Sequence, residues 1–404
     1  MRKIMVFGAG VVGMTSAYAL ARKGFAVTVV DAGSSPAQGG ASFGNGSQLS
    51  YFYTDAMASP SMATSLPKYL LGRDPAFRIE LTLSPRFLAW GLRFLAQSTQ
   101  TRFERNTVDI LKLAMRSRQE FSELSMKIEF DHRQTGKLNI YSSQVGLESA
   151  KRLSGLKNRL GAEQVILTPD EATAREPALA DYGHSFVGAL WSPHDESGDC
   201  NLFCRGLRAI LERDFGVKFM FNTRIRTLKA KSGRLTSFAT DEDEIFCDAA
   251  VLSLGSSTAT LARSVGLYLP LWPVQGYSMT IPATDLAPIA NITDASRKTV
   301  FSRIGNRLRI AGLADIRRGD GDFRQHRFQT LFETAQGIFP KAGDYCSDVK
   351  AWNGLRPVTP NSQPIVGRTK FDGLFLNCGH GSLGWTLSMA TAELLVADIL
   401  TPSQ

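Results

Sequence analysis

A glycine-rich turn near the start of the chain restricts the fold more than any other feature. The sequence Gly8-Ala9-Gly10-Val11-Val12-Gly13 follows a short apolar run, residues 3–7, that reads as a buried strand. Residues 12–23 carry helical periodicity, and a second apolar run, residues 25–31, ends on an acid. A strand, a tight turn, a helix and a second strand form a βαβ unit, so the sequence predicts parallel strands joined by a right-handed crossover.

The turn also matches the fingerprint of a dinucleotide site. Gly8 permits the tight turn, Gly10 lets the backbone approach a pyrophosphate, and Gly13 lets the helix pack closely against the strand. The free amides at the start of the helix favour phosphate. Asp31, about 20 residues further on, is placed to accept hydrogen bonds from ribose hydroxyls. This pattern is shared by NAD and FAD sites.

Two later segments favour FAD over NAD. Residues 40–48 are mostly small, so their backbone can lie against a flat ring system. A second glycine turn, residues 379–384, opens the last helix. Its amides can face the O2 and N1 region of a flavin, where negative charge develops on reduction. An NAD dehydrogenase would instead continue with further short βα units.

The chain is long enough for two domains. Its 404 residues exceed one typical core, and 43% hydrophobic with 21% charged residues is ordinary for a globular protein. The α/β pattern is interrupted, so the fold class that we predict is α/β plus α+β. A Rossmann-like cofactor domain is expected from residues 1–50, 195–270 and 345–404. A mixed-sheet substrate domain is expected from residues 51–194 and 271–344.

Composition limits the other classes of function. The five cysteines are scattered without C-x-x-C spacing, and the five histidines are dispersed, so we expect no disulfide framework and no metal site. There is no secretory apolar region, and no stretch approaches the ~20 apolar residues of a membrane span. We therefore expect a cytoplasmic protein.

The net charge of +9 is spread along the chain rather than gathered in blocks. We expect no nucleic-acid partner. Two interpretations of the charge stay open: a basic surface that solvates the protein, and attraction to an anionic membrane surface. The second would place the protein at the inner face of the membrane.

Seven motifs in chain order resemble those of the FAD-dependent D-amino acid oxidase superfamily, and most closely those of bacterial D-amino acid dehydrogenases. The resemblance runs nearly from end to end. It implies a glutathione-reductase-like FAD domain beside the substrate domain. The motifs are residues 8–13 with Asp31, residues 42–48, 195–200, 275–278, 354–360, 364–367 and 379–386.

The same resemblance implies which residues hold FAD. The ADP half would contact Gly8, Gly10, Val11, Val12, Gly13 and Asp31, with Ile225 at the adenine and Gly255 near the pyrophosphate. The ribityl and isoalloxazine half would contact Ser42, Asn45, Gly46, Ser47 and Gln48, with Gly381, Leu383, Gly384, Trp385 and Thr386 at the pyrimidine edge. The loop of residues 50–53 lacks the proline and glycine of these relatives, so we expect substrate choice to differ there.

Oxidation of an amino acid by a flavin is a hydride transfer from Cα to N5, which the cofactor supplies. If the free amine binds, no obligatory base is needed, but the substrate carboxylate needs a clamp. Arginine suits this role because its planar fork makes two parallel charge-assisted bonds. Arg356, expected in a rigid loop between Gly354 and Pro357, is our candidate, and the family uses this arginine in that role.

Three further side chains are candidates for the site. Tyr53 and Tyr277 are expected to contact the carboxylate or form the substrate wall, or else to pack at a domain seam. His380, between two glycines, is expected to stabilise the reduced ring as a positive or hydrogen-bonding imidazole. The acidic run 195–199 is expected to cap the helix that follows it.

The leading hypothesis is a dehydrogenase of D-amino acids that passes electrons to a quinone or another carrier. One alternative is an oxidase or dehydrogenase of secondary amines such as D-proline, hydroxyproline, sarcosine or an opine. Others are a subunit of a hetero-oligomeric amine dehydrogenase and an NAD-binding structural protein. The oligomeric state is open.

Overall fold

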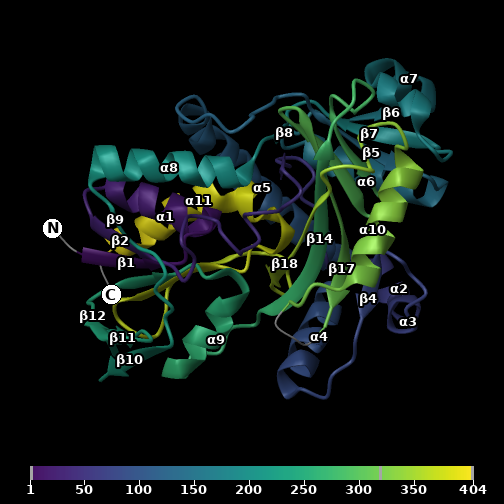
Figure 1. Cartoon of the computed structure of the whole chain (residues 1–404). Coiled ribbons are helices and arrows are strands. Elements are labelled where there is room, and N and C mark those ends of the chain that lie inside the picture. Colours follow the sequence, from purple (N-terminus) through teal and green to yellow (C-terminus); the bar gives the residue numbers. More distant parts are fainter. Residues whose placement is uncertain (1–2, 318–320, 402–404) are drawn as a thin grey trace.

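A six-stranded sheet carries the first βαβ unit of the protein, for which a computed structural model describes residues 3–317 and 321–401 (Figure 1). All neighbouring strands in it are parallel except β19, which is antiparallel to β20. Its strand order is β19 (Ile365–Arg368), β20 (Leu374–Cys378), β13 (Ala250–Leu252), β1 (Lys3–Phe7), β2 (Ala26–Val30) and β9 (Lys218–Met220). Residues from both ends of the chain therefore meet in one sheet.

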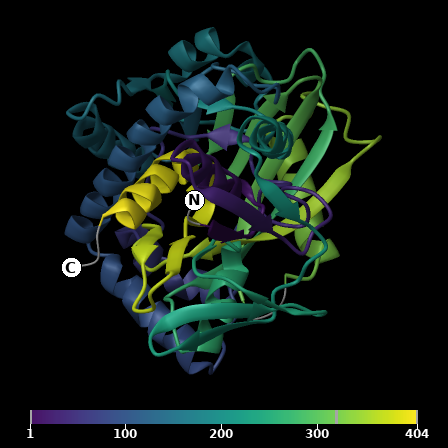
Figure 2. The same cartoon turned by 90° about the vertical axis from the view of Figure 1, so that its left-hand side faces the viewer.

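Helices cover one face of this sheet and share its largest apolar core. In Figure 2 the last helix, in yellow, lies between the purple N-terminal unit and the blue helices. The reason is composition: α11 is apolar on nearly all sides and α5 carries a buried stripe that includes Ile110, Leu111 and Phe121. The helices are α1 (Val11–Arg22), α5 (Gln100–Ser125), α8 (Cys200–Phe215) and α11 (Gly384–Leu400).

A small antiparallel sheet and short helices cover the opposite face. Phe238 packs edge-on against Phe7 of β1, with ring centroids 4.8 Å apart. These elements are β10 (Thr227–Lys231), β11 (Arg234–Ala239), β12 (Glu244–Phe246), η2 (Gly255–Ser257), α9 (Thr258–Ala262) and η3 (Arg263–Val265).

The second large layer is a mixed nine-stranded sheet. Most of its pairs are antiparallel, but β5 pairs with β15, and β4 with β17, in parallel. The order is β18 (Lys350–Val358), β14 (Trp272–Pro282), β17 (Arg307–Ile316), β16 (Thr299–Ile304), β15 (Asn291–Asp294), β5 (Lys137–Tyr141), β7 (Gly188–Ser192) and β6 (Val165–Leu167), with β4 (Phe77–Ile79) beside β17.

Alternation along β14 gives this sheet two different faces. Met279 and Ile281 enter the core beneath α10 (Gln325–Ile338), while Ser278 faces the six-stranded layer. The mixed sheet that the sequence predicted is thus confirmed. The remaining elements are α2 (Pro60–Thr64), α3 (Leu66–Leu70), α4 (Pro85–Gln97), α6 (Gln144–Asn158), α7 (Pro169–Arg175), η1 (Pro177–Asp181), α10 (Gln325–Ile338), η4 (Gly381–Leu383) and the two-stranded sheet of β3 (Gln48–Leu49) and β8 (Glu196–Ser197).

Two segments lie elsewhere than the predicted domain ranges placed them. The strand β18 joins the large sheet, although the sequence pattern puts residues 345–404 in the cofactor domain and predicts a loop here. Its Pro357 is tolerated because β18 is an edge strand. Helix α5, expected in the substrate domain, packs on α11. The division into two domains itself stays a prediction.

The expectation that no stretch approaches the length of a membrane span was wrong for the last helix. Gly381–Leu400 has 20 residues and a mean hydropathy of 1.4, which meets the length and composition of a span. However, 61% of it is buried, and it packs between α1 and α5. Its apolar character is therefore accounted for by its place in the core.

The close contact between α1 and the turn before it yields the first prediction. A Cβ on Gly13 would lie 1.8 Å from the carbonyl oxygen of Gly8, so Gly13→Ala must move the helix. Overpacking of this kind costs about 1–3 kcal/mol or more. We expect thermal unfolding of the variant at a temperature several degrees lower, and weaker binding of the expected dinucleotide.

Gly155→Ala is the matched control, because a Cβ added to this exposed glycine of α6 would meet no heavy atom within 4 Å. It should be neutral or stabilising by up to about 1 kcal/mol. Equal unfolding temperatures for Gly13→Ala and the native protein would show that the contact is not tight.

Candidate cofactor and substrate site

One large cavity of about 1950 Å³ lies between the two sheet layers. Typical sites for drug-sized ligands measure about 300–1,000 Å³, so this cavity has room for a dinucleotide and a second small molecule. Its wall includes Asp31 and Gly10 of the first βαβ unit, Asn45 of the following loop, and Trp385 and Arg356 from the C-terminal part of the chain. The structure thus brings together residues that are distant in sequence.

The glycine turn borders the cavity as the fingerprint predicts. Gly8 has a φ of 105°, and a Cβ there would lie 2.5 Å from the carbonyl oxygen of Ser253. The hydroxyl of Ser42 accepts a hydrogen bond from the amide of Val11 at 3.0 Å. Its own O–H remains available as a donor toward a phosphate oxygen at the start of α1. Gly13 does not line the cavity, in agreement with its packing role.

Asp31 is fixed by two backbone amides. Its Oδ2 accepts from Ala9 at 2.6 Å and its Oδ1 from Gly33 at 2.7 Å. Each carboxylate oxygen retains a lone pair that can accept from a ribose hydroxyl. Because Asp31 also lines the cavity, its geometry supports the predicted role at the ADP half.

At the adenine contact the expected residue does not line the cavity. Ile225 does not line the cavity: its side chain packs on the apolar cluster of β13 and β20, whereas the neighbouring Arg224 borders the cavity. Successive side chains in an extended segment point in opposite directions, which explains why Arg224 borders the cavity and Ile225 does not. Gly255, with a φ of 58°, lines the cavity.

The loop of residues 44–48 is tied down on the large sheet. Gln48 lines the cavity and donates to the carbonyl of Ile292 at 3.3 Å, while Ser47 is buried and faces away from the cavity. Three side chains of the sheet bond the carbonyls of this loop: Ser278 to Gly44 at 2.7 Å, Arg309 to Asn45 at 2.9 Å and Ser302 to Gly46 at 3.0 Å. The loop is therefore a rigid part of the wall.

The second glycine turn closes the cavity from the other side. Gly381, Leu383, Gly384 and Trp385 line it, and Gly381 has a φ of 56°. Thr386 does not line the cavity, and its hydroxyl accepts a hydrogen bond from the amide of Ser50 at 3.0 Å. The indole N–H of Trp385 is buried and has no hydrogen-bond partner among the described residues. A buried donor without a partner is expected to bind a ligand or water.

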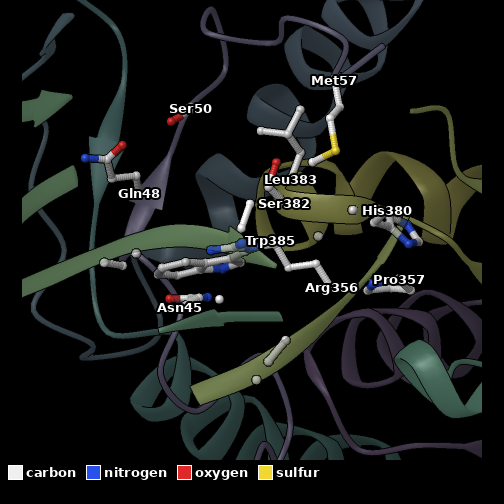
Figure 3. Close-up of a pocket in the computed structure, with 18 of the residues that line it drawn as sticks. Asn45, Gln48, Ser50, Met57, Arg356, Pro357, His380, Ser382, Leu383 and Trp385 are labelled. Atoms are coloured by element: carbon white, nitrogen blue, oxygen red, sulfur yellow. The ribbon is translucent and has the colours of Figure 1, made fainter. Parts of the chain in front are cut away.

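Arg356 projects into the same cavity from β18, not from a loop as expected (Figure 3). Its Nη1 donates to the carbonyl of Leu313 at 2.9 Å. The guanidinium lies on the backbone of Gly276, where a Cβ would be 2.2 Å from Nη2. Burial lowers the pKa of Arg356, with Asp315 opposing the shift, yet arginine remains protonated in proteins.

None of the described carboxylates forms an ion pair with Arg356; the pairing of Asp315, for example, is with Arg327. The side chain is half-buried, and a cation withdrawn from water without an acidic partner is costly, so this position favours an anionic ligand.

The two candidate tyrosines differ in position. Tyr53 lines the cavity, and the Nζ of Lys137 lies 4.4 Å from its ring centroid. The ring of Tyr277 packs in the core beneath α10, with its centroid 6.0 Å from that of Phe323. The hydroxyl of Tyr277 is buried without a hydrogen-bond partner among the described residues. Tyr277 nevertheless lines the cavity as Tyr53 does, so substrate contact by either tyrosine stays a prediction.

His380 lines the cavity but is not positive. Only 3% of it is exposed, and its Nε2 shares a hydrogen bond with Thr391 Oγ1 at 3.0 Å. Burial lowers the pKa of the imidazole to about 3. Of the two roles expected for His380, burial disfavours the positive imidazole at neutral pH, and the hydrogen-bonding role at the reduced ring stays a prediction.

The acidic run has two roles. Asp199 caps α8 by accepting from the amides of Asn201 and Leu202, as predicted. Asp195 is instead buried beneath the cavity wall and accepts from the amide of Phe52 at 2.9 Å. Burial raises the pKa of Asp195 to about 6, an effect that Lys137 opposes.

Lys137 was not predicted from the sequence. It is 2% exposed, lines the cavity and donates to Ser50 Oγ at 2.9 Å. Burial lowers the pKa of this amine to about 8. The available signal was a lysine at the start of a predicted strand, a position worth attention because buried lysines are rare.

These features fit a flavin dinucleotide, and comparison with known proteins agrees. The chain belongs to the FAD dependent oxidoreductase family, whose profile matches residues 3–398. FAD is therefore its cofactor, as predicted, and the family resemblance is confirmed.

Among its relatives are dehydrogenases of amino acids. The chain is 40% identical to a D-amino acid dehydrogenase of Paramagnetospirillum magneticum, covering 99% of this chain and 95% of the relative. It is 38% identical to D-amino acid dehydrogenase 2 of Ralstonia nicotianae, with 98% and 96% covered.

Solved structures share the fold. L-proline dehydrogenase from P. horikoshii aligns with a TM-score of 0.72 at 17% identity, covering 99% of this chain and 93% of that one. Glycine oxidase from Bacillus cereus aligns with a TM-score of 0.70 at 18% identity, covering 98% and 94%. At this level of identity the likeness concerns architecture alone.

The position of Asp31 predicts a loss of cofactor affinity on substitution. In Asp31→Ala the ribose loses charged hydrogen bonds worth roughly 1.5–3 kcal/mol. Titration of the apoprotein with FAD should show affinity lower by tenfold or more. Asp31→Asn, which keeps one acceptor oxygen, should lie between. Unchanged affinity in both variants would remove Asp31 from the ribose site.

The buried neutral state of His380 predicts a pH dependence of stability. The folded protein keeps the imidazole neutral down to about pH 3, whereas an unfolded chain protonates it near pH 6.5. Between these values the unfolded state binds more protons, so stability falls as the pH falls. The contribution is present above about pH 6.5 and declines by up to about 1.4 kcal/mol per pH unit below it.

Denaturant unfolding at roughly pH 4.5 to 7 tests the effect. In this range His380 titrates in the unfolded chain but not in the folded protein. His380→Gln should flatten the slope of unfolding free energy against pH, while the exposed His326→Gln should leave it unchanged. Identical slopes for all three proteins would mean that the pKa of His380 is the same in the folded and the unfolded protein.

Proposed function

We propose that the protein is a D-amino acid dehydrogenase: it catalyses the FAD-dependent oxidative deamination of D-amino acids and passes the electrons to a quinone or another carrier. The observation that carries the proposal is the cationic group of Arg356 on the cavity wall, with no acidic partner among the described residues. When bound, FAD accepts a hydride from the substrate Cα. Side chains of the cavity bind and orient the substrate and exclude water.

Arg356 binds the substrate carboxylate in this proposal. One of its N–H groups is used by the carbonyl of Leu313, which fixes the plane of the guanidinium. The glycine at position 276 gives the guanidinium a flat surface on which to lie. The other N–H groups are then available for a bidentate bond, which orients the Cα–H bond of the substrate.

The opposite side of the pocket is less polar. In Figure 3, Met57 and Leu383 lie above Arg356, and the neutral His380 lies beside Pro357. The loop that carries Met57 is held by a hydrogen bond from its amide to Ser362 Oγ at 2.9 Å. Apolar groups here exclude water from the reacting carbon and favour the neutral amine, from which hydride transfer is easiest.

We further propose a cytoplasmic location at the inner face of the membrane. The support is the net charge of +9, which is attracted to anionic lipid, and the lipid solubility of a quinone acceptor. An anaerobic screen that follows flavin absorbance tests the substrate class: D-amino acids should bleach it faster than D-proline, sarcosine or L-amino acids. Bleaching by secondary amines alone would replace the proposal with the alternative class.

The clamp predicts the effect of two substitutions of Arg356. Arg356→Lys keeps the charge but loses the fork, and Arg356→Met loses both. Breaking a buried charged pair costs several kcal/mol, so kcat/KM for the best D-amino acid should fall by roughly 100-fold or more. The amount of bound FAD should not change. Amines without a carboxylate should be poor substrates of every form.

Gly276→Ala supplies an independent arm of this test. Its new Cβ would occupy the place of Nη2 and displace the guanidinium without changing any charge. We expect a loss of kcat/KM comparable with that of Arg356→Lys. Wild-type kcat/KM in both Arg356→Met and Gly276→Ala would place the carboxylate elsewhere.

A further inference from the structure

Helix α4 and the loop before it expose a group of leucines that no part of the described structure covers. The group is made of five side chains, which we call the leucine surface. Their exposed fractions are 72% for Leu81, 93% for Leu83, 48% for Leu88, 70% for Leu92 and 39% for Leu95. Single exposed leucines are normal, but five within 15 consecutive residues form a patch of the kind that marks a binding surface.

The leucine surface is not a by-product of poor packing. Helix α4 already buries a separate face through Phe87, Trp90 and Phe94, at spacings of three and four residues. Trp90 donates its indole N–H to the carbonyl of Val358 at 2.9 Å. Leu88, Leu92 and Leu95 follow the same helical spacing on a different face. The helix therefore has one apolar face for the core and another for solvent.

Basic side chains border the leucine surface. Residues 60–99 contain five lysines and arginines against two acids, Asp74 and Glu80. Both acids are engaged elsewhere, with Lys68 and Arg324 respectively. Arg86 and Arg93 on α4 are exposed and form no ion pair with a described residue.

The basic border continues onto a second segment of the chain. Arg263 of η3 is close enough to Arg86 for repulsion between the two to lower the pKa of Arg263, in addition to the larger effect of burial. Tyr268, 76% exposed, follows on the same segment. In Figure 1, α4 and α9, which directly precedes η3, lie at the same end of the molecule.

We propose, resting on the membrane location proposed above, that the leucine surface, with Arg86, Arg93 and Arg263, is the site at which the protein docks on an anionic lipid bilayer. Leucines that protrude beside arginines match an interfacial helix, whose apolar side chains enter the acyl boundary while basic groups meet lipid phosphates. Arginine and an interfacial tyrosine suit the headgroup level. A second copy of the chain fits less well, because a twofold contact would bring the same arginines together.

Docking in this way places the substrate cavity near the membrane. Trp90 of α4 is bonded to Val358, two residues beyond Arg356 on β18. Residues 59–62, at the start of α2, also line the cavity. An electron acceptor dissolved in the bilayer would therefore approach the protein on the side where α4 contacts β18, a strand of the cavity wall.

Vesicle binding by the holoenzyme tests the proposal. The probes are vesicles of phosphatidylcholine with phosphatidylglycerol, and vesicles of phosphatidylcholine alone. The native protein should co-sediment with the anionic vesicles, more weakly at high salt, and less with the neutral ones. Leu83→Gln/Leu88→Gln/Leu92→Gln should bind at least tenfold more weakly. Arg86→Gln/Arg93→Gln should lose the preference for anionic lipid.

The matched control is Met126→Gln/Phe246→Gln, at side chains that are 81% and 80% exposed on other parts of the surface. It should bind like the native protein. Oxidation of a D-amino acid with a water-soluble dye should be unchanged in all variants, whereas reduction of a vesicle-embedded quinone should fall in the leucine variant. Dye activity thus tests the proposed function separately from docking.

Three results would overturn the docking site. One is native binding by the triple leucine variant. Another is the absence of vesicle binding by the native holoenzyme. The third is a size-exclusion shift from dimer to monomer in the leucine variant with vesicle binding unaffected, which would assign the leucine surface to a contact between copies.

Discussion

The bonds that hold residues 44–46 on the large sheet are the interaction on which the site depends. The loop leaves the first βαβ unit, yet its carbonyls are bonded by Ser278, Arg309 and Ser302 of the other layer. These bonds join the two layers at the place where the cavity lies, so the positions of the cofactor wall and the substrate wall are fixed relative to each other. Of these three side chains, Arg309 contributes most to holding the loop, because it is charged and buried and its Nε is also bonded to Thr280 at 2.7 Å.

Local patterns in the sequence predicted that the first glycine turn and Asp31 border one cavity. Gly8, Gly10, Gly13 and Asp31 act within one βαβ unit, whose spacing is set by the strand and helix themselves. The substrate end was harder. Gly354 and Pro357 are typical of a loop, whereas β18 is an edge strand, where the missing amide of a proline leaves no ladder bond unmade.

Properties that arise only from tertiary burial could not be predicted. The charge state of His380 depends on enclosure by α11, and the position of Lys137 inside the cavity depends on the register of β5 against β15 and β7. The prediction named Ile225, but its neighbour Arg224 borders the cavity. Side chains alternate in direction along an extended segment, and the sequence alone did not show which of the two neighbours faces the cavity. In each case the residue type was visible and its surroundings were not.

The strand order of the six-stranded sheet has a consequence for synthesis of the protein. The strand β1 needs β13 as its neighbour, and β13 in turn needs β20, so partners lie more than 240 and then more than 120 residues apart. A ribosome has therefore made nearly the whole chain before this sheet can close. Until then the apolar strands 3–7 and 26–30 lack partners on one side, and such unpaired strand edges favour aggregation of the nascent chain.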